Sequence, residues 1–198
     1  MEYLKATNLT FDPRMQISAL VVDAYYDLIE HFKKDIMKIT KALAASLLLE
    51  YFYVAVENGE VAAIVACKEN KPPPVKLDKK VFVKYLGLIM GNIAYPVINK
   101  HMMEHRYPFE LPARTGSIEI VATAAKYRGR GIAQDLAEHV MNALPYEDYV
   151  LEVVDTNASA IRLYQKMGFR EIMRTDAPKR AGFNHFVYMK KETLCINE

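Results

Sequence analysis

The chain has 198 residues, of which 52% are hydrophobic, so it is long enough for one domain with a sizeable core and short for two. Its net charge of +2 comes from mixed charges with no basic stripe, which argues against nucleic acid as a partner, and it has no low-complexity tract that would indicate disorder. Its two cysteines, Cys67 and Cys195, lack metal-ligand spacing, and the N-terminus lacks the apolar core of a signal peptide, which together indicate one cytoplasmic domain over 1–198 without a bound metal.

The first part of the chain predicts one strand and two helices. The strand is expected at 3–10. Asp12-Pro13 then opens a helix, because aspartate caps helix N-termini and proline suits the first turn. Apolar residues follow at helical spacing, namely Ile17, Leu20, Val21, Ala24 and Leu28. A second helix is expected at about 36–49.

A hairpin and an inserted segment come next. Two β-rich runs flank the turn Asn58-Gly59, which is the strongest short-range hairpin signal. A run of prolines then ends strand pairing and begins a helical insertion at about 72–112. Within it, apolar residues are expected on one side of a helix that Pro96 bends or ends; they are Val81, Tyr85, Leu88 and Ile89.

The apolar run 86–98 inside this insertion raises the question of a membrane. It is too short to cross one and contains Asn92 and Pro96. We therefore expect no membrane contact, and two readings stay open: a buried helix, or the interface of a homodimer, for which Gly87 and Gly91 permit close packing.

The stretch 117–133 combines a strand, a glycine turn and a helix start. Its strand half carries Ile118 and Ile120, and its second half reads Arg-Gly-Arg-Gly-Ile-Ala over 128–133. Glycine lets the backbone come close to a ligand, and the unpaired N–H groups of a first helical turn attract phosphate. Gln134 stands where a Rossmann fingerprint needs its third glycine, and no Walker A loop is present. The stretch therefore predicts a phosphate cradle of another kind.

A second motif runs from 151 to 169. It reads as an apolar strand, an N-cap at Thr156 or Asn157, a short helix and a C-capping Gly168, with Phe169 beginning a last hairpin at about 169–175 and 183–190. Asn157 and Tyr164 have spacings that place them on one face of the helix.

Both motifs resemble signatures of the GNAT superfamily, the acyl-CoA-dependent N-acetyltransferases. The turn resembles R/Q-x-x-G-x-G/A, and the second motif resembles N-x-x-A-x-x-L-Y-x-x-x-G-F. The resemblance implies an α/β GNAT fold, with a mixed central sheet of about six to seven strands flanked by helices and with the helical insertion between strands 3 and 4. The insertion is not covered by the resemblance, so we expect it to govern the choice of acceptor.

The resemblance also implies how acetyl-CoA (coenzyme A) is held. Backbone amides of the turn would hold the pyrophosphate, Asn157 would bond the pantetheine arm, and N–H groups of a strand that leaves its neighbour would bind the thioester carbonyl. The expected cofactor-binding residues are Val121, Ala122, Thr123, Arg128, Gly129, Arg130, Gly131, Ile132, Ala133 and Asn157.

Two residues are expected to be catalytic. Glu119 precedes Arg128 by nine residues, a spacing at which GNAT enzymes often carry a base; the alternative is an edge-exposed or salt-bridged carboxylate, because glutamate is costly to bury unless paired. Tyr164 is expected to give a proton to the departing thiolate, and the alternative is a core tyrosine. His185 is left out, because lone histidines are more often structural.

The sequence therefore predicts transfer of an acetyl group directly to a primary amine of a small molecule or peptide. A transferase of another acyl group and a non-catalytic CoA-binding regulatory protein remain alternatives. A covalent route through Cys67 also stays open. Aromatic residues near the end of the first helix either belong to core and surface or wall the acceptor pocket; they are Tyr25, Tyr26, His31 and Phe32.

Overall fold

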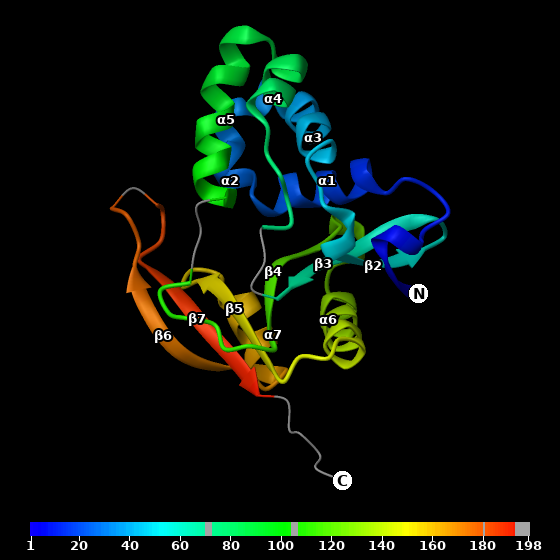
Figure 1. Ribbon diagram of the computed structural model, residues 1–198, viewed down its shortest axis with the longest axis vertical. Helices are drawn as coiled ribbons and strands as arrows, with labels where there is room; N and C mark the ends of the chain where they lie inside the picture. The colour runs from blue at the N-terminus through cyan, green and yellow to red at the C-terminus, as the bar shows by residue number, and fades with distance from the viewer. Residues whose placement is uncertain (70–72, 104–106, 180, 193–198) are drawn as a thin grey trace.

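The computed structural model describes residues 1–69, 73–103, 107–179 and 181–192. Seven strands form one mixed sheet in the order β1-β2-β3-β4-β5-β7-β6 (Figure 1). Neighbouring strands are antiparallel except for the central pair β4 and β5, which is parallel. The strands are β1 (Glu2–Lys5), β2 (Phe52–Glu57), β3 (Glu60–Lys68), β4 (Thr115–Thr123), β5 (Asp148–Val154), β6 (Arg170–Asp176) and β7 (His185–Glu192).

Helices cover both faces of the sheet and make two cores. One core joins the first face to the N-terminal and inserted helices, which are α1 (Arg14–Ala24), α2 (Tyr26–Ile29), α3 (Ile36–Ala44), α4 (Lys79–Leu86) and α5 (Leu88–Met103). The other core joins the opposite face to α6 (Ile132–Ala143) and α7 (Ala158–Lys166). Short 3-10 helices lie at Ala6–Asn8, Glu30–Asp35, Leu49–Tyr51 and Ala125–Tyr127. The α/β architecture predicted from the sequence is confirmed.

The N-terminal elements are shorter than predicted. β1 ends at Lys5 rather than residue 10, because Lys5 pairs with Tyr53 and the partner strand begins at Phe52, so no backbone remains to pair with. The second helix, α3, ends at Ala44 rather than near 49. Pro13 is the N-cap of α1 and not its first residue, while Asp12 accepts from the backbone N–H of Arg14 at 3.1 Å.

The insertion between β3 and β4 forms the helical pair α4 and α5, which stands above the sheet in Figure 1. Asp78 caps α4 by accepting from the N–H of Lys80 at 2.7 Å. Gly91 lets the two helices meet closely, because a Cβ there would lie 2.6 Å from the Cα of Val83. Residues 71–72 and 104–106 of this segment lie outside the described residues.

The expected apolar stripe of the insertion is only half correct. Val81 and Tyr85 pack against the core, but Leu88 and Ile89 are 72% and 78% exposed. The helical phase does not continue between them, because Gly87 has φ +82° and separates α4 from α5. α5 also runs through Pro96 instead of ending there. Within the described residues, no helix combines the length and the apolarity needed to cross a membrane.

The two central strands separate part of the way along. β4 and β5 pair only from Thr115–Asp148 to Ile118–Leu151, although β4 continues to Thr123 and β5 to Val154. We call the diverging ends, 119–123 and 152–154, the fork. The expectation of a strand that leaves its neighbour is confirmed by this register.

Candidate active site at the fork

The β4 side of the fork exposes backbone to a ligand. Val121, Ala122 and Thr123 stay paired with β3 along one edge of the strand. Their other edge faces the gap left by β5, and all three residues are half-buried. N–H groups on that edge are therefore placed to bind the carbonyl and amide groups of a ligand lying in the fork.

A β-bulge at Glu119 aims this side chain. Ala66 pairs with Ile120 and Cys67 with Ile118, so Glu119 is an extra residue on β4. Ile118 belongs to the α6–α7 core and Ile120 to the core under α1 and α3, so the strand changes face across the bulge. Bulges of this kind redirect side chains next to active sites.

Glu119 is paired with polar neighbours of the sheet. Its Oε1 accepts from the hydroxyl of Ser117 at 2.6 Å and lies 3.2 Å from the ammonium of Lys68. The Glu119 side chain is 17% exposed and that of Lys68 is 11% exposed. The salt-bridged alternative is thus present in the structure, yet both contacts fall on Oε1, and in the described part of the chain no hydrogen bond engages Oε2.

The glycine turn before α6 has the backbone of an anion cradle. Gly129 and Gly131 have φ values of +75° and +77°, a left-handed conformation that glycine adopts without strain. Gly131 is the N-cap of α6 and has no side chain to cap the first-turn N–H groups. A Cβ built on either glycine meets nothing within 4 Å, so the space above the turn is open. Ile132 and Ala133 begin the helix directly behind it.

The two arginines of the turn are engaged by carboxylates on other elements. Arg128 donates from Nε to the carbonyl of Thr123 at 3.1 Å and contacts Asp23 of α1. Arg130 binds both carboxylate oxygens of Glu57 at 2.9 and 3.1 Å, and this hydrogen bonding lowers the pKa of Glu57. The positive charge expected at the turn is therefore partly neutralised, and the arginines anchor the turn to its neighbours.

Asn157 is the N-cap of α7, the helix that follows β5 in the chain, and Tyr164 lies within that helix. Oδ1 of Asn157 caps the helix by accepting from the N–H of Ala160 at 3.1 Å, while no hydrogen bond of the described residues uses its Nδ2. Tyr164 is 7% exposed and belongs to the α6–α7 core, so the core-tyrosine alternative is present in the structure, and the centroid of its ring lies 5.8 Å from that of Phe169. Burial, followed by the neighbouring Tyr25, raises the pKa of Tyr164, so its hydroxyl holds its proton.

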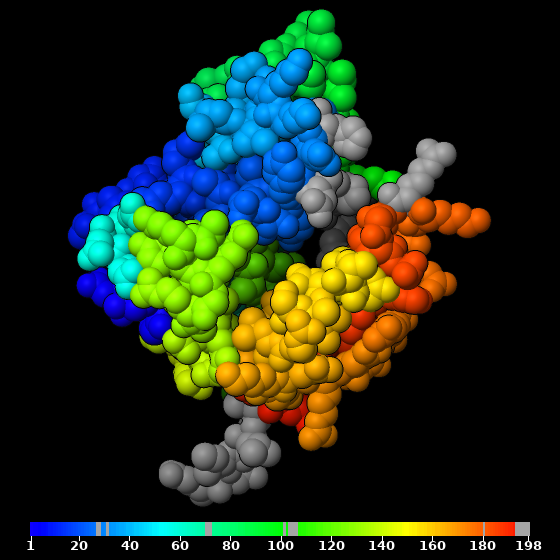
Figure 2. All heavy atoms as spheres, turned by 180° about the vertical axis from the view of Figure 1, so that it is seen from behind, coloured from blue at the N-terminus to red at the C-terminus, as the bar shows by residue number. Residues whose placement is uncertain are grey.

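A surface hollow leads to this place. Figure 2 shows it between the blue N-terminal helices, the yellow-green α6 and the yellow α7, with green atoms of the β4 region at its floor. The hollow thus lies between α6, α7 and the N-terminal helices on one face of the molecule.

Four aromatic residues near the end of the first helix were expected to belong either to core and surface or to the wall of the acceptor pocket. The structure gives them different environments. Burial and then the carboxylates of Glu119 and Glu152 raise the pKa of Tyr25 to about 12, and its side chain is partly buried against the core. Tyr26 is 40% exposed and Phe32 is buried in the core. The side chain of His31 lies outside the described residues.

Sequence reasoning missed a second carboxylate and an aromatic wall. Glu152 is the first residue of β5 beyond the paired region and is the register partner of Tyr188 on β7. The centroid of the Tyr188 ring lies 6.0 Å from that of Tyr107 and 5.7 Å from that of Phe109. The matching triplets Ile-Glu-Ile at 118–120 and Leu-Glu-Val at 151–153 could have indicated the carboxylate, whereas the aromatics after α5 carry no recognisable pattern.

Two further reactive side chains lie outside this constellation. Cys67 is 3% exposed in the α6–α7 core, and burial first, then Glu119, raises its pKa to about 12. His185 lies 3.1 Å from Asp155 and 3.6 Å from Asp176, at the base of the last hairpin. Across the described ranges, no three His, Cys, Asp or Glu side chains gather as a metal site would require.

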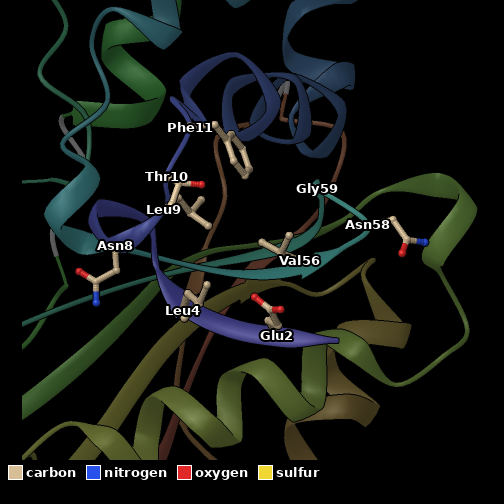
Figure 3. A pocket seen from close by; sticks show the side chains of 9 residues that line it. All are labelled: Glu2, Leu4, Asn8, Leu9, Thr10, Phe11, Val56, Asn58 and Gly59. Atoms are coloured by element: carbon tan, nitrogen blue, oxygen red, sulfur yellow. The ribbon is translucent and has the colours of Figure 1, made fainter.

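A separate depression of about 450 Å³ lies at the β1 edge of the sheet (Figure 3). It contains no catalytic pair and is remote from the fork along the sheet order, so we do not assign it the chemistry. Its lining residues are Glu2, Leu4, Asn8, Leu9, Thr10, Phe11, Val56, Asn58 and Gly59.

The fold is shared with solved acetyltransferases. An N-acetyltransferase from Staphylococcus aureus Mu50 is 19% identical, with a TM-score of 0.62 over 91% of this chain and 96% of its own. A histone acetyltransferase HPA2 and related acetyltransferase from Corynebacterium glutamicum is 17% identical, with a TM-score of 0.63 over 99% and 98%. A NatC complex bound to Gag peptide and CoA is 17% identical, with a TM-score of 0.51 over 98% and 99%. No curated protein matches the sequence.

The sequence itself carries the stronger evidence. The model of the acetyltransferase (GNAT) family matches residues 16–169, which include β4, the glycine turn, α6, β5 and α7. This match spans well over half of the chain, and the chain therefore belongs to the GNAT acetyltransferase family.

Proposed function

We propose that this protein transfers an acetyl group from acetyl-CoA directly to a primary amine of a small molecule or peptide. The observation that carries the proposal is the fork, where β4 with the bulged Glu119 leaves β5, the strand that leads into the α7 motif with Tyr164. Family membership supports the acyltransferase chemistry.

The residues present fit coenzyme A. The uncapped start of α6 and the open space above Gly129 and Gly131 suit its pyrophosphate. The free edge of β4 over 121–123 and the amide Nδ2 of Asn157 suit the amides of the pantetheine arm. Bound acetyl-CoA would supply the thioester, and the chain's own residues would orient it and move protons.

Each proton transfer has a residue to perform it. An attacking amine must be neutral, and Glu119 is placed to take its proton, directly or through a water at Oε2. The new C–N bond forms as the C–S bond breaks, and the sulfur leaves as a thiolate. The neutral hydroxyl of Tyr164 donates to that thiolate. N–H groups of Val121 to Thr123 would stabilise the charge on the carbonyl oxygen.

Direct transfer is favoured over a covalent acyl-enzyme. A nucleophilic cysteine needs an accessible thiolate, and Cys67 is buried with its pKa raised to about 12.

A panel assay tests the proposal. Purified protein is mixed with acetyl-CoA and each of several primary amines, and both thiol release and the mass of the amine product are measured. We expect amine-dependent thiol release with an acetylated product. Tight CoA binding without turnover on any amine would favour a regulatory CoA-binding protein, and faster turnover with propionyl-CoA or a longer acyl-CoA would replace acetyl with another acyl group.

A further inference from the structure

We infer that Glu152 binds the acceptor and that the acceptor is a dibasic amine, one that carries a second positive charge besides the reacting nitrogen. The inference rests on the proposed function and adds to it a substrate class and a specificity-determining residue.

Two carboxylates, those of Glu119 and Glu152, face the same side of the sheet at the fork. Ile118 and Leu151 are the last pair of β4 and β5, so Glu119 and Glu152 are the next residues of the two strands. Leu151 and Val153 point into the α6–α7 core, and alternation therefore turns Glu152 to the opposite face. The bulge directs Glu119 to that same face. Burial first, and then the charges of both carboxylates, raise the pKa of Tyr25 and of Tyr107, which agrees with this shared face.

The carboxylates have different surroundings. Oε1 of Glu119 accepts a hydrogen bond from the hydroxyl of Ser117 and lies beside the ammonium of Lys68. Proton transfer is therefore assigned to its other oxygen, Oε2. Glu152 is the register partner of Tyr188 on β7, and burial first, opposed by Thr175 and supported by the charge of Glu152, raises the pKa of that tyrosine to about 12. Glu152 is therefore held in place by the sheet, one strand away from the base.

The wall beside Glu152 favours cations and alkyl chains. Tyr107, Phe109 and Tyr188 form a triangle of rings with centroids 5.5, 5.7 and 6.0 Å apart. Aromatic faces attract ammonium groups and pack against methylene chains, but they offer no donor to an anion other than a tyrosine hydroxyl. An acceptor carrying a carboxylate would meet the negative charge of Glu152 beside the Lys68–Glu119 ion pair. A diamine would place one nitrogen near Glu119 and the other against Glu152.

Three acceptors with the same four-carbon chain separate these cases: the diamine putrescine, the monoamine butylamine and the amino acid γ-aminobutyrate. We expect kcat/KM to fall in that order. In Glu152→Gln, kcat/KM for putrescine should fall about 10- to 100-fold, as for loss of one charged hydrogen bond, and kcat/KM for butylamine should change less than about threefold. Glu147→Gln, on an exposed residue paired with Arg114, is the matched control and should change neither value.

A second variant guards against misfolding of Glu152→Gln. Phe109→Leu removes one ring of the wall and should reduce the preference for putrescine over butylamine, while the CoA affinity measured by calorimetry stays unchanged. Equal kcat/KM for all three acceptors, or an equal loss for putrescine and butylamine in Glu152→Gln, would overturn the inference.

The test also separates the inference from the proposed function. If CoA binds and no amine is acetylated, the proposed function fails, and the inference is decided by calorimetric binding of putrescine and butylamine to the CoA-bound protein. Preferential binding of putrescine that is lost in Glu152→Gln would still support the dibasic site. Equal or absent binding of both would reject it.

Discussion

The ammonium of Lys68 lies 3.2 Å from Oε1 of Glu119, and the two side chains are only 11% and 17% exposed. This ion pair joins β3 to the bulge of β4 and holds the candidate base in place. A largely buried carboxylate that loses its cation is left without compensation, which is more costly than losing an exposed pair.

The first prediction is a measurable coupling between these two side chains. A double-mutant cycle of Lys68→Met and Glu119→Gln should give a coupling free energy of about 1–2 kcal/mol in urea unfolding. The exposed pair Arg114–Glu147, with side chains 62% and 44% exposed, provides the control cycle and should couple by less than about 0.5 kcal/mol. Equal coupling in both cycles would show that the Lys68–Glu119 pair has no special role.

The pH dependence of catalysis tests Glu119 as the base. In Glu119→Gln, the acid limb of the kcat profile should move to higher pH, because the amine must then lose its proton without help. High pH should partly restore the rate. The measurement is kcat from about pH 6 to 9.5 with the best acceptor. An unaltered profile would place the base elsewhere or mean that the amine arrives neutral.

The cradle can be tested at Gly131. Gly131→Val places a branched side chain at φ +77° and in the open space above the turn, so the Kd for CoA should rise about tenfold or more. Gly182→Val is the control, because Gly182 has φ +81° and equally open surroundings in the last hairpin. It should lose similar stability and keep its CoA affinity. Equal CoA affinity in a folded Gly131→Val would remove the cradle from the binding site.

Alkaline unfolding tests the position of Tyr25. Its pKa is raised from 10.0 to about 12 in the folded protein, so the folded state keeps the phenol neutral where the unfolded chain ionises. The resulting stability is complete below about pH 10 and is lost as the pH rises towards about 12, by roughly 2–3 kcal/mol in total. Tyr25→Phe cannot ionise there, and its urea midpoint should fall less between pH 9 and about 11 than that of wild type. The exposed Tyr26→Phe should follow wild type. A Tyr25→Phe curve as steep as wild type would contradict this environment.

Several parts of the fold could be predicted from sequence because their signals are local. The hairpin turn Asn58-Gly59, the capped helix at Asn157 and the left-handed glycines each depend on a few adjacent residues. The strand expected at 3–10 failed because its length depends on where β2 begins, which is information from elsewhere in the chain.

The site was only partly predictable for the same reason. Glu119 and Tyr164 follow from motifs, but the partner of Glu119 is Lys68 on another strand. We expected the insertion to govern the choice of acceptor, but two tyrosines of its helices, Tyr85 and Tyr95, pack against the core. The residues of the insertion that reach β7 are Tyr107 and Phe109, whose rings contact that of Tyr188. These contacts join residues that are far apart in the chain, so no local pattern in the sequence indicates them.

The most direct test of acetyl transfer at the fork is kcat of Tyr164→Phe, measured with saturating acetyl-CoA and amine beside wild type. The ring and its contact with Phe169 remain, so the fold and the CoA Kd should be unchanged. We expect kcat to fall about a hundredfold with little change in either KM, because the thiolate loses its proton donor. The half-buried Tyr51→Phe should keep the wild-type rate. A Tyr164→Phe protein that turns over as fast as wild type would contradict the account, since the thiolate would then take its proton from water.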